Sequence, residues 1–325
     1  MEVTIPNKTA GTTWNGGGDR PFNSSYGKMM MWFFLISDAL TFAGFLGAYG
    51  MMRFKFLDSW PIADEVFTHV PFTHESYPMI YVAFMTFVLI FSSVTMVFAV
   101  DAGKQMKQKK VAFYMLLTIV GGIIFLGSQA WEWKNFIKGD KGAVVLSSGE
   151  IAQFVDKSGH QIALTSFAAV NHSDRVQHTK LNGIWNKKES TLPLVNMQQV
   201  LEGFNANPNI SIRTQQIDKA TKTKVVLSRA ESTKLLKSAT QVVYGANLKV
   251  NEYGLTLFGD FFFFITGFHG FHVLSGILIN VIILFNVLVG TYEKRGHYEM
   301  VEKSGLYWHF VDLVWIFVFT FFYLF

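Results

Sequence analysis

Long apolar stretches alternate with polar segments along this chain. Five stretches are almost free of charged residues: 29–52, 79–100, 111–131, 255–289 and 306–325. Each is near or above the roughly 20 residues that an α-helix needs to cross the hydrocarbon of a bilayer. Helices are the expected form, because backbone polar groups in lipid must be satisfied within the segment. The pattern therefore predicts an all-α membrane protein with five transmembrane helices, of which the fourth is long enough to tilt or to extend beyond the membrane.

The polar segments divide the chain into four parts. We expect a polar amino-terminal tail at 1–27, three transmembrane helices within 28–133, an extramembrane insertion at 134–253, and two transmembrane helices within 254–325. The insertion has only short apolar runs, which predict a small domain of mixed or uncertain structure. Its stretch 205–223 is polar and weakly patterned, and we expect part of it to be disordered.

The distribution of charge among the short loops predicts an orientation. The loop 101–110 contains four Lys, and the loop 291–304 contains two Lys and one Arg, whereas the loop between the first two apolar stretches is rich in Asp and Glu. Because Lys and Arg are enriched in cytoplasmic loops, the amino terminus should be cytoplasmic and the carboxyl terminus external. The insertion is then external, and long loops escape this rule.

Composition supports a membrane protein and excludes several kinds of site. Of the 325 residues 50% are hydrophobic and 16% are charged, against about 25% charged in a typical soluble protein. The absence of Cys excludes disulfides, thiolate metal sites and a Cys nucleophile. The insertion carries 16 of the 28 Lys and Arg, so the net charge of +5 originates there. We therefore expect no nucleic-acid partner.

Two carboxyl groups lie within or at the end of apolar stretches, where ionisable residues are candidates for function. Asp38 lies well inside the first stretch, where burial is expected to favour its neutral form. It is either a proton-linked carboxyl or a structural one hydrogen-bonded to a neighbouring helix. Glu132 lies between Trp131 and Trp133, and flanking Trp residues are typical of the membrane–water boundary. An interfacial carboxylate and a more specific role both remain open for Glu132.

The fourth stretch contains two imidazoles in the sequence Thr-Gly-Phe-His-Gly-Phe-His-Val of residues 266–273. His269 and His272 are three residues apart and share a helix face. Such a pair could ligate a metal or haem, but no carboxylate stands at an obvious ligand spacing, and we expect no metal site. Bonds across helices or to lipid headgroups are favoured instead. Gly267 and Gly270 are small enough to let another helix or a lipid tail approach closely.

The fifth stretch opens with a second polar cluster, Trp308, His309 and Asp312. His309 and Asp312 are again three residues apart, so the carboxyl group could orient the imidazole or share its proton. The favoured interpretation is a structural pair within the bundle. We expect Trp308 and His309 to contact lipid or a helix interface.

These motifs together resemble subunit III of the haem–copper oxidases, the cytochrome c oxidase family. Residues 266–273 resemble its penultimate-helix motif, and residues 307–315 resemble its final-helix signature. Residues 34–44 resemble the helix that carries the family's buried carboxylate, and Gln129-Ala-Trp-Glu132 matches a further family pattern. The motifs follow the family's order, and the resemblance covers residues 28–133 and 254–325. Within the family, this chain resembles the bacterial form that has five helices.

The chain departs from the family pattern in three places. It resembles the five-helix form, without the first two helices of the seven-helix members. The family's buried carboxylate is usually Glu, whereas this chain has the shorter Asp38, so a direct proton role is less secure. The insertion at 134–253 has no counterpart in the usual pattern. One interpretation is that it docks an electron-donating complex or cytochrome c, and the other is that it is a loosely held elaboration.

The resemblance implies a non-catalytic integral subunit of a respiratory terminal oxidase in a bacterial plasma membrane. Such a subunit has no redox centre of its own and is part of an enzyme without being one. It packs against subunit I, beside other oxidase subunits, and supports aerobic electron transport, oxygen reduction and proton uptake. Haems and copper are expected in the partner subunits, and phospholipids are expected to bind this chain.

Three other functions are weighed against this one. A close variant is subunit III of a quinol oxidase, since this chain does not determine the electron donor. A membrane haem protein would have to use the three imidazoles of the apolar stretches. A secondary transporter often shows paired internal repeats, and the sequence has no such symmetry.

Overall fold

The computed structural model describes residues 25–71, 77–170, 178–181, 184–187, 195–218, 221, 223–246 and 249–324. Five long helices form its main body: α1 (Tyr26–Lys55), α3 (Ile80–Lys104), α4 (Gln108–Lys138), α7 (Thr256–Leu288) and α9 (Glu299–Phe319). The last of these continues as a π-helical turn, η4 (Thr320–Leu324). All five are long and apolar enough to cross a membrane, which confirms the predicted class of all-α membrane bundle.

The helix ends follow from local sequence signals. Ser25 caps α1 by accepting a hydrogen bond from the Lys28 backbone N–H. Helix α4 ends at Gly139, whose φ of +68° is a backbone conformation that favours glycine. Helix α7 is a single helix of 33 residues, about 50 Å long at 1.5 Å per residue, so it extends beyond a 30 Å hydrocarbon core when upright.

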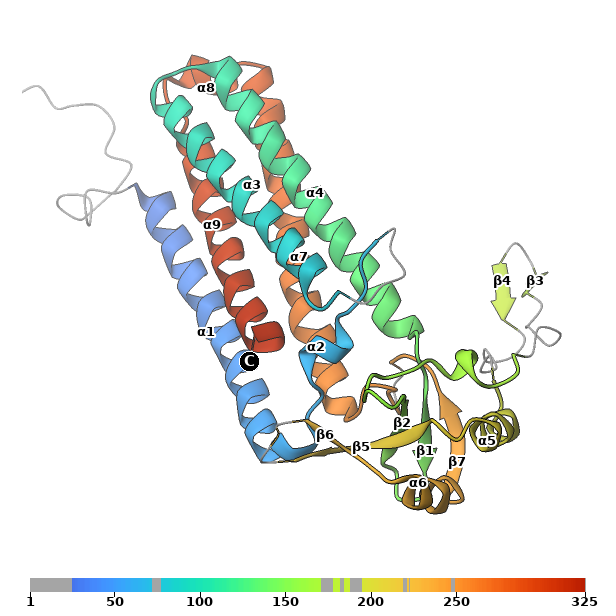
Figure 1. Cartoon of the computed structure of the whole chain (residues 1–325). Helices are drawn as coiled ribbons and strands as arrows, with labels where there is room; N and C mark the ends of the chain where they lie inside the picture. The colour runs from blue at the N-terminus through green and yellow to red at the C-terminus, as the bar shows by residue number, and fades with distance from the viewer. Residues whose placement is uncertain are drawn as a thin grey trace, which may run out of the picture.

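The helices are arranged around α9 (Figure 1). Helices α3 and α4 lie antiparallel, α4 contacts α7, and α9 contacts α1, α3 and α7. The largest fully buried side chains of α9 are Trp308 and Trp315. Helix α1 packs mainly on α9 and leaves much of its apolar surface exposed, including Phe33 and Leu40. That exposed side is suited to lipid or to another membrane subunit.

Short elements connect the bundle to a small domain at one of its ends. Between α1 and α3 lie η2 (Leu57–Ser59) and α2 (Ala63–Val66), and between α7 and α9 lies α8 (Thr291–Arg295). Helix α8 lies beside the turn between α3 and α4, at the end opposite the inserted domain (Figure 1). The two Lys-rich loops therefore lie at the same end of the bundle.

The inserted domain is built around a five-stranded antiparallel sheet in the order β6-β5-β2-β1-β7. Its strands are β1 (Ala143–Leu146), β2 (Ile151–Val155), β5 (Ser211–Ile217), β6 (Lys224–Val226) and β7 (Ala239–Val243). Helices α5 (Met197–Ala206) and α6 (Arg229–Leu236) pack on one face of the sheet and share a core with it. The turn η3 (Leu164–Ser166) joins that core, and β3 (His178–Leu181) and β4 (Ile184–Lys187) form a separate hairpin.

The expectation of disorder within 205–223 is wrong for its described residues. Strand β5 occupies 211–217, and its residues Ile212 and Arg213 are both buried. Strand β5 pairs with β2 and β6, so long-range ladder bonds that no local pattern reveals hold it in place. The adjoining helices carry clear start signals, since Asn196 with Gln199 and Ser228 with Glu231 form capping boxes.

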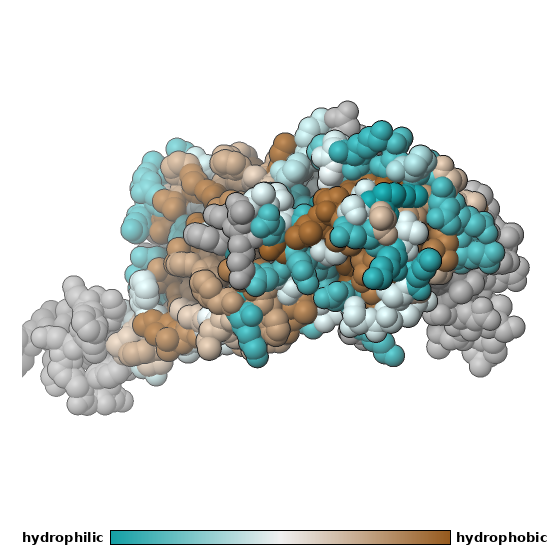
Figure 2. Space-filling view, turned by 60° about the horizontal axis from the view of Figure 1, so that its bottom comes forward, coloured by the Kyte–Doolittle hydropathy of each residue, from teal (hydrophilic) through white to brown (hydrophobic). Residues whose placement is uncertain are grey.

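The inserted domain enters and leaves the bundle at one point. Gly139, which follows α4, lies against Gly245, which follows β7. The carboxylate of Glu252 accepts hydrogen bonds from the backbone N–H groups of Gly142 (3.1 Å) and Gly245 (2.6 Å). One buried side chain thus ties both connections together. Figure 2 shows hydrophilic surface gathered over this domain and more hydrophobic surface along the helices.

Candidate functional site

Asp38 and His272 form a pair between α1 and α7. The Nε2 atom of His272 lies 3.4 Å from Oδ2 of Asp38, and their side chains are 10% and 18% exposed. The Nδ1 atom of His272 lies 2.8 Å from the carbonyl oxygen of Phe268 in its own helix, so Nδ1 carries a proton and donates there. Nε2 is then the ring nitrogen that faces the Asp38 carboxyl group. The pair therefore places a carboxyl group and an imidazole side by side at the joint between α1 and α7.

His269 has a different partner, although it lies on the same helix. Its Nε2 atom lies 3.0 Å from the carbonyl oxygen of Val311 on α9, and its ring is fully buried between Phe125 and Trp315. Its Nδ1 atom has no hydrogen-bond partner in the described structure. The two imidazoles of α7 thus serve two different helix joints rather than one common ligand site.

His309 and Asp312 meet through a serine of α3 rather than directly. Ser93 Oγ lies 2.7 Å from His309 Nδ1, and the same hydroxyl hydrogen-bonds the Asp312 carboxyl group. The neighbouring Ser92 accepts a hydrogen bond from the indole of Trp308 at 3.1 Å. The polar residues of α9 are therefore bound to a pair of serines that fixes α9 against α3.

Glycines on α4 and α7 make room for large side chains at the helix joints. A Cβ atom on Gly267 would lie 3.0 Å from the ring of Trp133, and one on Gly270 would lie 3.3 Å from Gln129. Trp308 lies between α4 and α7, where a Cβ on Gly122 or Gly276 would come within 2.6 Å or 3.0 Å of its indole. These helices approach closely because the glycines have no side chain.

Glu132 lies inside the bundle. It is 6% exposed, and its Oε2 accepts a hydrogen bond from Tyr323 of η4 at 3.0 Å. Trp131 beside it is half-buried and packs against Tyr81 of α3 with ring centroids 4.6 Å apart. The flanking Trp residues suggested a boundary position, but the carboxyl group of Glu132 points into the protein.

Several of these partners carried little signal in the sequence. Ser92 and Ser93 stand side by side in an otherwise apolar stretch, and that pair of hydroxyls could have marked the face toward α9. Tyr323 lies almost at the end of the chain and has no motif around it. Its role follows only from the packing of η4 against α4.

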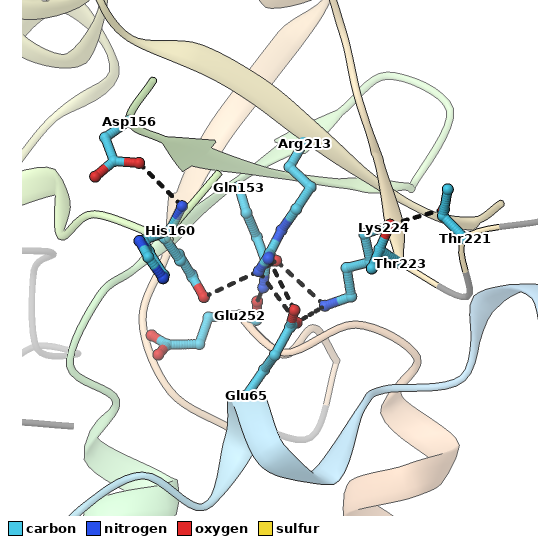
Figure 3. Close-up of polar contacts among 10 residues, drawn as sticks. Glu65, Gln153, Asp156, His160, Arg213, Thr221, Thr223, Lys224 and Glu252 are labelled. Carbon is cyan, nitrogen blue, oxygen red and sulfur yellow. Dashed lines mark hydrogen bonds and ion pairs between the residues drawn. The ribbon is translucent and has the colours of Figure 1, made fainter. Parts of the chain in front are cut away.

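A second cluster joins the inserted domain to the loop between α1 and α3 (Figure 3). The carboxylate of Glu65 on α2 accepts two hydrogen bonds from the Arg213 guanidinium, at 2.8 and 3.1 Å, and lies 2.7 Å from Lys224 Nζ. Gln153 of β2 contacts both cations through its Oε1, at 2.8 and 3.3 Å. We call Glu65, Gln153, Arg213 and Lys224 the docking cluster.

The docking cluster places two cations in a buried setting. Burial lowers the pKa of Lys224 and the pKa of Arg213, and the nearby Glu65 carboxylate opposes that shift in both. The side chains of Arg213 and Lys224 are 8% and 4% exposed, whereas that of Glu65 is 28% exposed. Because charges this enclosed need a counter-charge, Glu65 fixes where the sheet sits on the bundle. In the sequence, the acidic residues of this loop indicate only the orientation of the chain in the membrane.

No arrangement of three or more His, Asp or Glu that could hold a metal ion occurs among the described residues. The buried polar groups instead hydrogen-bond to hydroxyls, backbone carbonyls or one another across helix joints. This arrangement can hold helices together, and it defines a class: an integral membrane protein whose polar interior connects helices.

Comparisons with known proteins show what part of this chain is similar to. Residues 231–325 match the family model described as cytochrome c oxidase subunit III. Proteins named cytochrome c oxidase subunit 3 are similar over shorter stretches. The one from Mycosarcoma maydis is 48% identical over 64 residues, or 19% of this chain and 22% of that protein.

Two further relatives bear the same name. The protein from Rhipicephalus sanguineus is 46% identical over 80 residues (25% of this chain, 30% of that protein), and the one from Synechocystis is 46% identical over 76 residues (22% and 32%). The chain thus spans less than a third of the length of these relatives. By these matches the carboxyl-terminal part of the chain is similar to cytochrome c oxidase subunit III, the family that its motifs resemble.

Proposed function

We propose that this chain is the non-catalytic subunit III of a respiratory terminal oxidase. The observation that carries the proposal is the buried polar network of α7 and α9, which lies within the segment that matches the family. Asp38 and His272 extend that network to α1. In this function the chain supports oxygen reduction and proton uptake by subunit I and holds no redox centre itself. Haems and copper are in the partner subunits.

The exposed apolar surface supports contact with other membrane components. Helix α1 exposes large side chains such as Trp32, Phe33 and Leu40, with exposed fractions of 55%, 60% and 70%. So much apolar area needs lipid or a membrane partner beside it. We assign subunit I and bound phospholipids to this surface.

The inserted domain belongs on the external side in this proposal, and the amino terminus on the cytoplasmic side of a bacterial plasma membrane. The Lys-rich loops at the opposite end of the bundle support that orientation. The domain's 16 cations against 9 acidic residues between 134 and 253 favour an acidic partner over a basic cytochrome c.

Co-purification in mild detergent tests the proposal. We expect the tagged chain to bring down a larger subunit, and we expect the visible spectrum of the assembly to show haem. Oxygen uptake with reduced cytochrome c and with quinol then identifies the donor and separates a cytochrome c oxidase from a quinol oxidase. Tight haem binding by the isolated chain, or purification without partners from membranes that respire, would refute the proposal.

A further inference from the structure

A small cavity lies beside Glu132, at the end of the bundle that carries the inserted domain. Its volume is about 20 Å³, and its walls include Glu132 and Asn135 of α4, Tyr81 of α3 and His69 of the loop after α2. One water molecule needs roughly 10–15 Å³ measured in this way, together with two to four polar partners. The cavity is therefore large enough for one water.

Two polar atoms are left over at this cavity. Glu132 Oε1 and Asn135 Nδ2 are both buried, and neither has a hydrogen-bond partner in the described structure. Because Oε2 of Glu132 accepts from Tyr323, Oε1 carries the proton of an uncharged carboxyl group and donates, as Nδ2 does. Leaving such atoms unpaired costs about 1–3 kcal/mol each. A water oxygen has two lone pairs, so one water in this cavity within hydrogen-bond distance of both atoms would satisfy both.

Among the described residues, no cation is paired with the Glu132 carboxyl group. The groups that face it are the hydroxyl of Tyr323 from η4, Tyr81 from α3 and His69 from the loop after α2. His69 is directed to another acid, since its Nε2 lies 3.6 Å from Oδ2 of Asp140. Burial of a carboxyl group without a cation favours its uncharged form.

The cavity adjoins a route to the surface. His69, Tyr81 and Trp131 line both this cavity and a larger hollow of about 550 Å³, whose walls also include Val70, Ile124 and Ser128. His69 is 32% exposed. A path from the cavity to solvent would therefore pass the shared wall at His69.

We propose that Glu132 and Asn135 bind a buried water molecule, and that this water exchanges the proton of the Glu132 carboxyl group with solvent at the inserted-domain end of the bundle. In each exchange the carboxyl group passes one proton to the water and receives another from it. The net charge of the site is thus unchanged. The proposal does not depend on which electron donor or partner subunit the chain has.

Infrared spectroscopy in H2O and D2O tests this site on the chain in its native membrane assembly. We expect a carbonyl band of a protonated carboxyl group that disappears in Glu132→Gln and shifts in wild type after transfer to D2O. In Asn135→Val the band should remain, but its shift should be about ten-fold slower, the change that corresponds to about 1.4 kcal/mol of barrier. Asn280→Val is the matched control, because Asn280 is also a buried amide with an unpartnered atom and does not line this cavity.

A second variant keeps the test decisive if Asn135→Val does not assemble. His69→Phe changes a wall shared by the cavity and the outer hollow, and it should slow the exchange to a similar degree. The proposal is overturned if wild type has no exchangeable carboxyl band that depends on Glu132. It is also overturned if Asn135→Val and His69→Phe exchange as fast as wild type, or if the control is slowed as much as they are.

Discussion

His272 Nε2 lies 3.4 Å from Asp38 Oδ2, across the joint between α1 and α7. Nδ1 of His272 donates to the Phe268 carbonyl, so Nε2 is the ring nitrogen that faces the Asp38 carboxyl group. Asn has nearly the same size and shape as Asp, so Asp38→Asn keeps the shape of the side chain and can still form a neutral hydrogen bond. We expect the activation free energy of steady oxygen reduction by the assembly to rise by less than about 1 kcal/mol, so that the rate falls by less than about five-fold.

Oxygen uptake by the purified assembly measures that effect. Asp101→Asn is the control, because Asp101 lies at the exposed end of α3 and contacts only Gln105 among the described side chains. Complete loss of turnover in Asp38→Asn, with assembly intact, would show that the charge on Asp38 cycles.

Ser93 is predicted to be the most sensitive position of the α3–α9 joint. Ser93→Ala removes the hydroxyl that contacts both His309 and Asp312, and each loss of a buried hydrogen bond costs about 1–3 kcal/mol. His309→Leu should cost less, because Ser93 still binds Asp312. Thermal unfolding in detergent compares the two variants. Equal stability of Ser93→Ala and wild type would mean that the serine does not join the helices.

Trp308 should limit the size of the residues that face it. Gly122→Ala would place a Cβ 2.6 Å from the indole, and we expect it to destabilise the bundle by about 1–3 kcal/mol. Gly127 is the matched control on the same helix, because a Cβ there meets nothing within 4 Å. Gly127→Ala should be neutral or stabilising by up to about 1 kcal/mol. Equal loss of stability in both variants would contradict this assignment.

The docking cluster predicts how the inserted domain is held. Glu65→Gln leaves two buried cations without their counter-charge, and loss of one partner from such a group costs about 3 kcal/mol. Hydrogen exchange should increase in α2 and along β5 and β6, and it should stay unchanged in α9. Glu150→Gln is the control, because Glu150 lies in an exposed turn of the same domain. Unchanged exchange near α2 would show that the apolar contacts are sufficient.

Acid should loosen the contact between the loop after α2 and the end of α4. A hydrogen bond from His69 lowers the pKa of Asp140 below its ordinary value of 3.8. A carboxyl group whose pKa is lowered by folding stabilises the folded state at pH values above its ordinary pKa. That stabilisation is lost as the pH falls through the lowered pKa. His69→Gln should therefore shift this acid transition to higher pH, by a small amount because the Asp140 side chain is 65% exposed. Proteolysis of the 66–71 segment against pH measures it, and a transition that does not move would refute the link.

The sequence was sufficient to predict the helices of the bundle, but it did not predict which side chains contact one another between them. The five apolar stretches predicted the helices, because hydrophobic length can be seen along the chain. The motifs around His269 and Trp308 predicted the similarity to cytochrome c oxidase subunit III, because they lie in the segment that matches its family model. The pairing of Asp38 with His272 and of Glu132 with Tyr323 depends on which helices become neighbours. No local pattern contains that information.

The inserted domain shows the same limit more strongly. Its strands pair residues that are far apart in sequence, such as Gln153 with Arg213. The short apolar runs therefore did not predict the order of the strands in the sheet. Arg213 in particular looked like one more surface cation of a basic segment. Only the folded sheet places it against Glu65, more than a hundred residues earlier in the chain.

The meeting of Gly139 with Gly245 bears on how such a chain can arise. Two helices that must stay fixed in a membrane tolerate a new domain between them only if its two ends leave their spacing unaltered. Here the two ends of the domain are in contact, and the Glu252 carboxylate joins them by hydrogen bonds to the backbone on both sides. Evolution can accordingly add, exchange or discard the whole sheet domain at this junction while α4 and α7 keep their places.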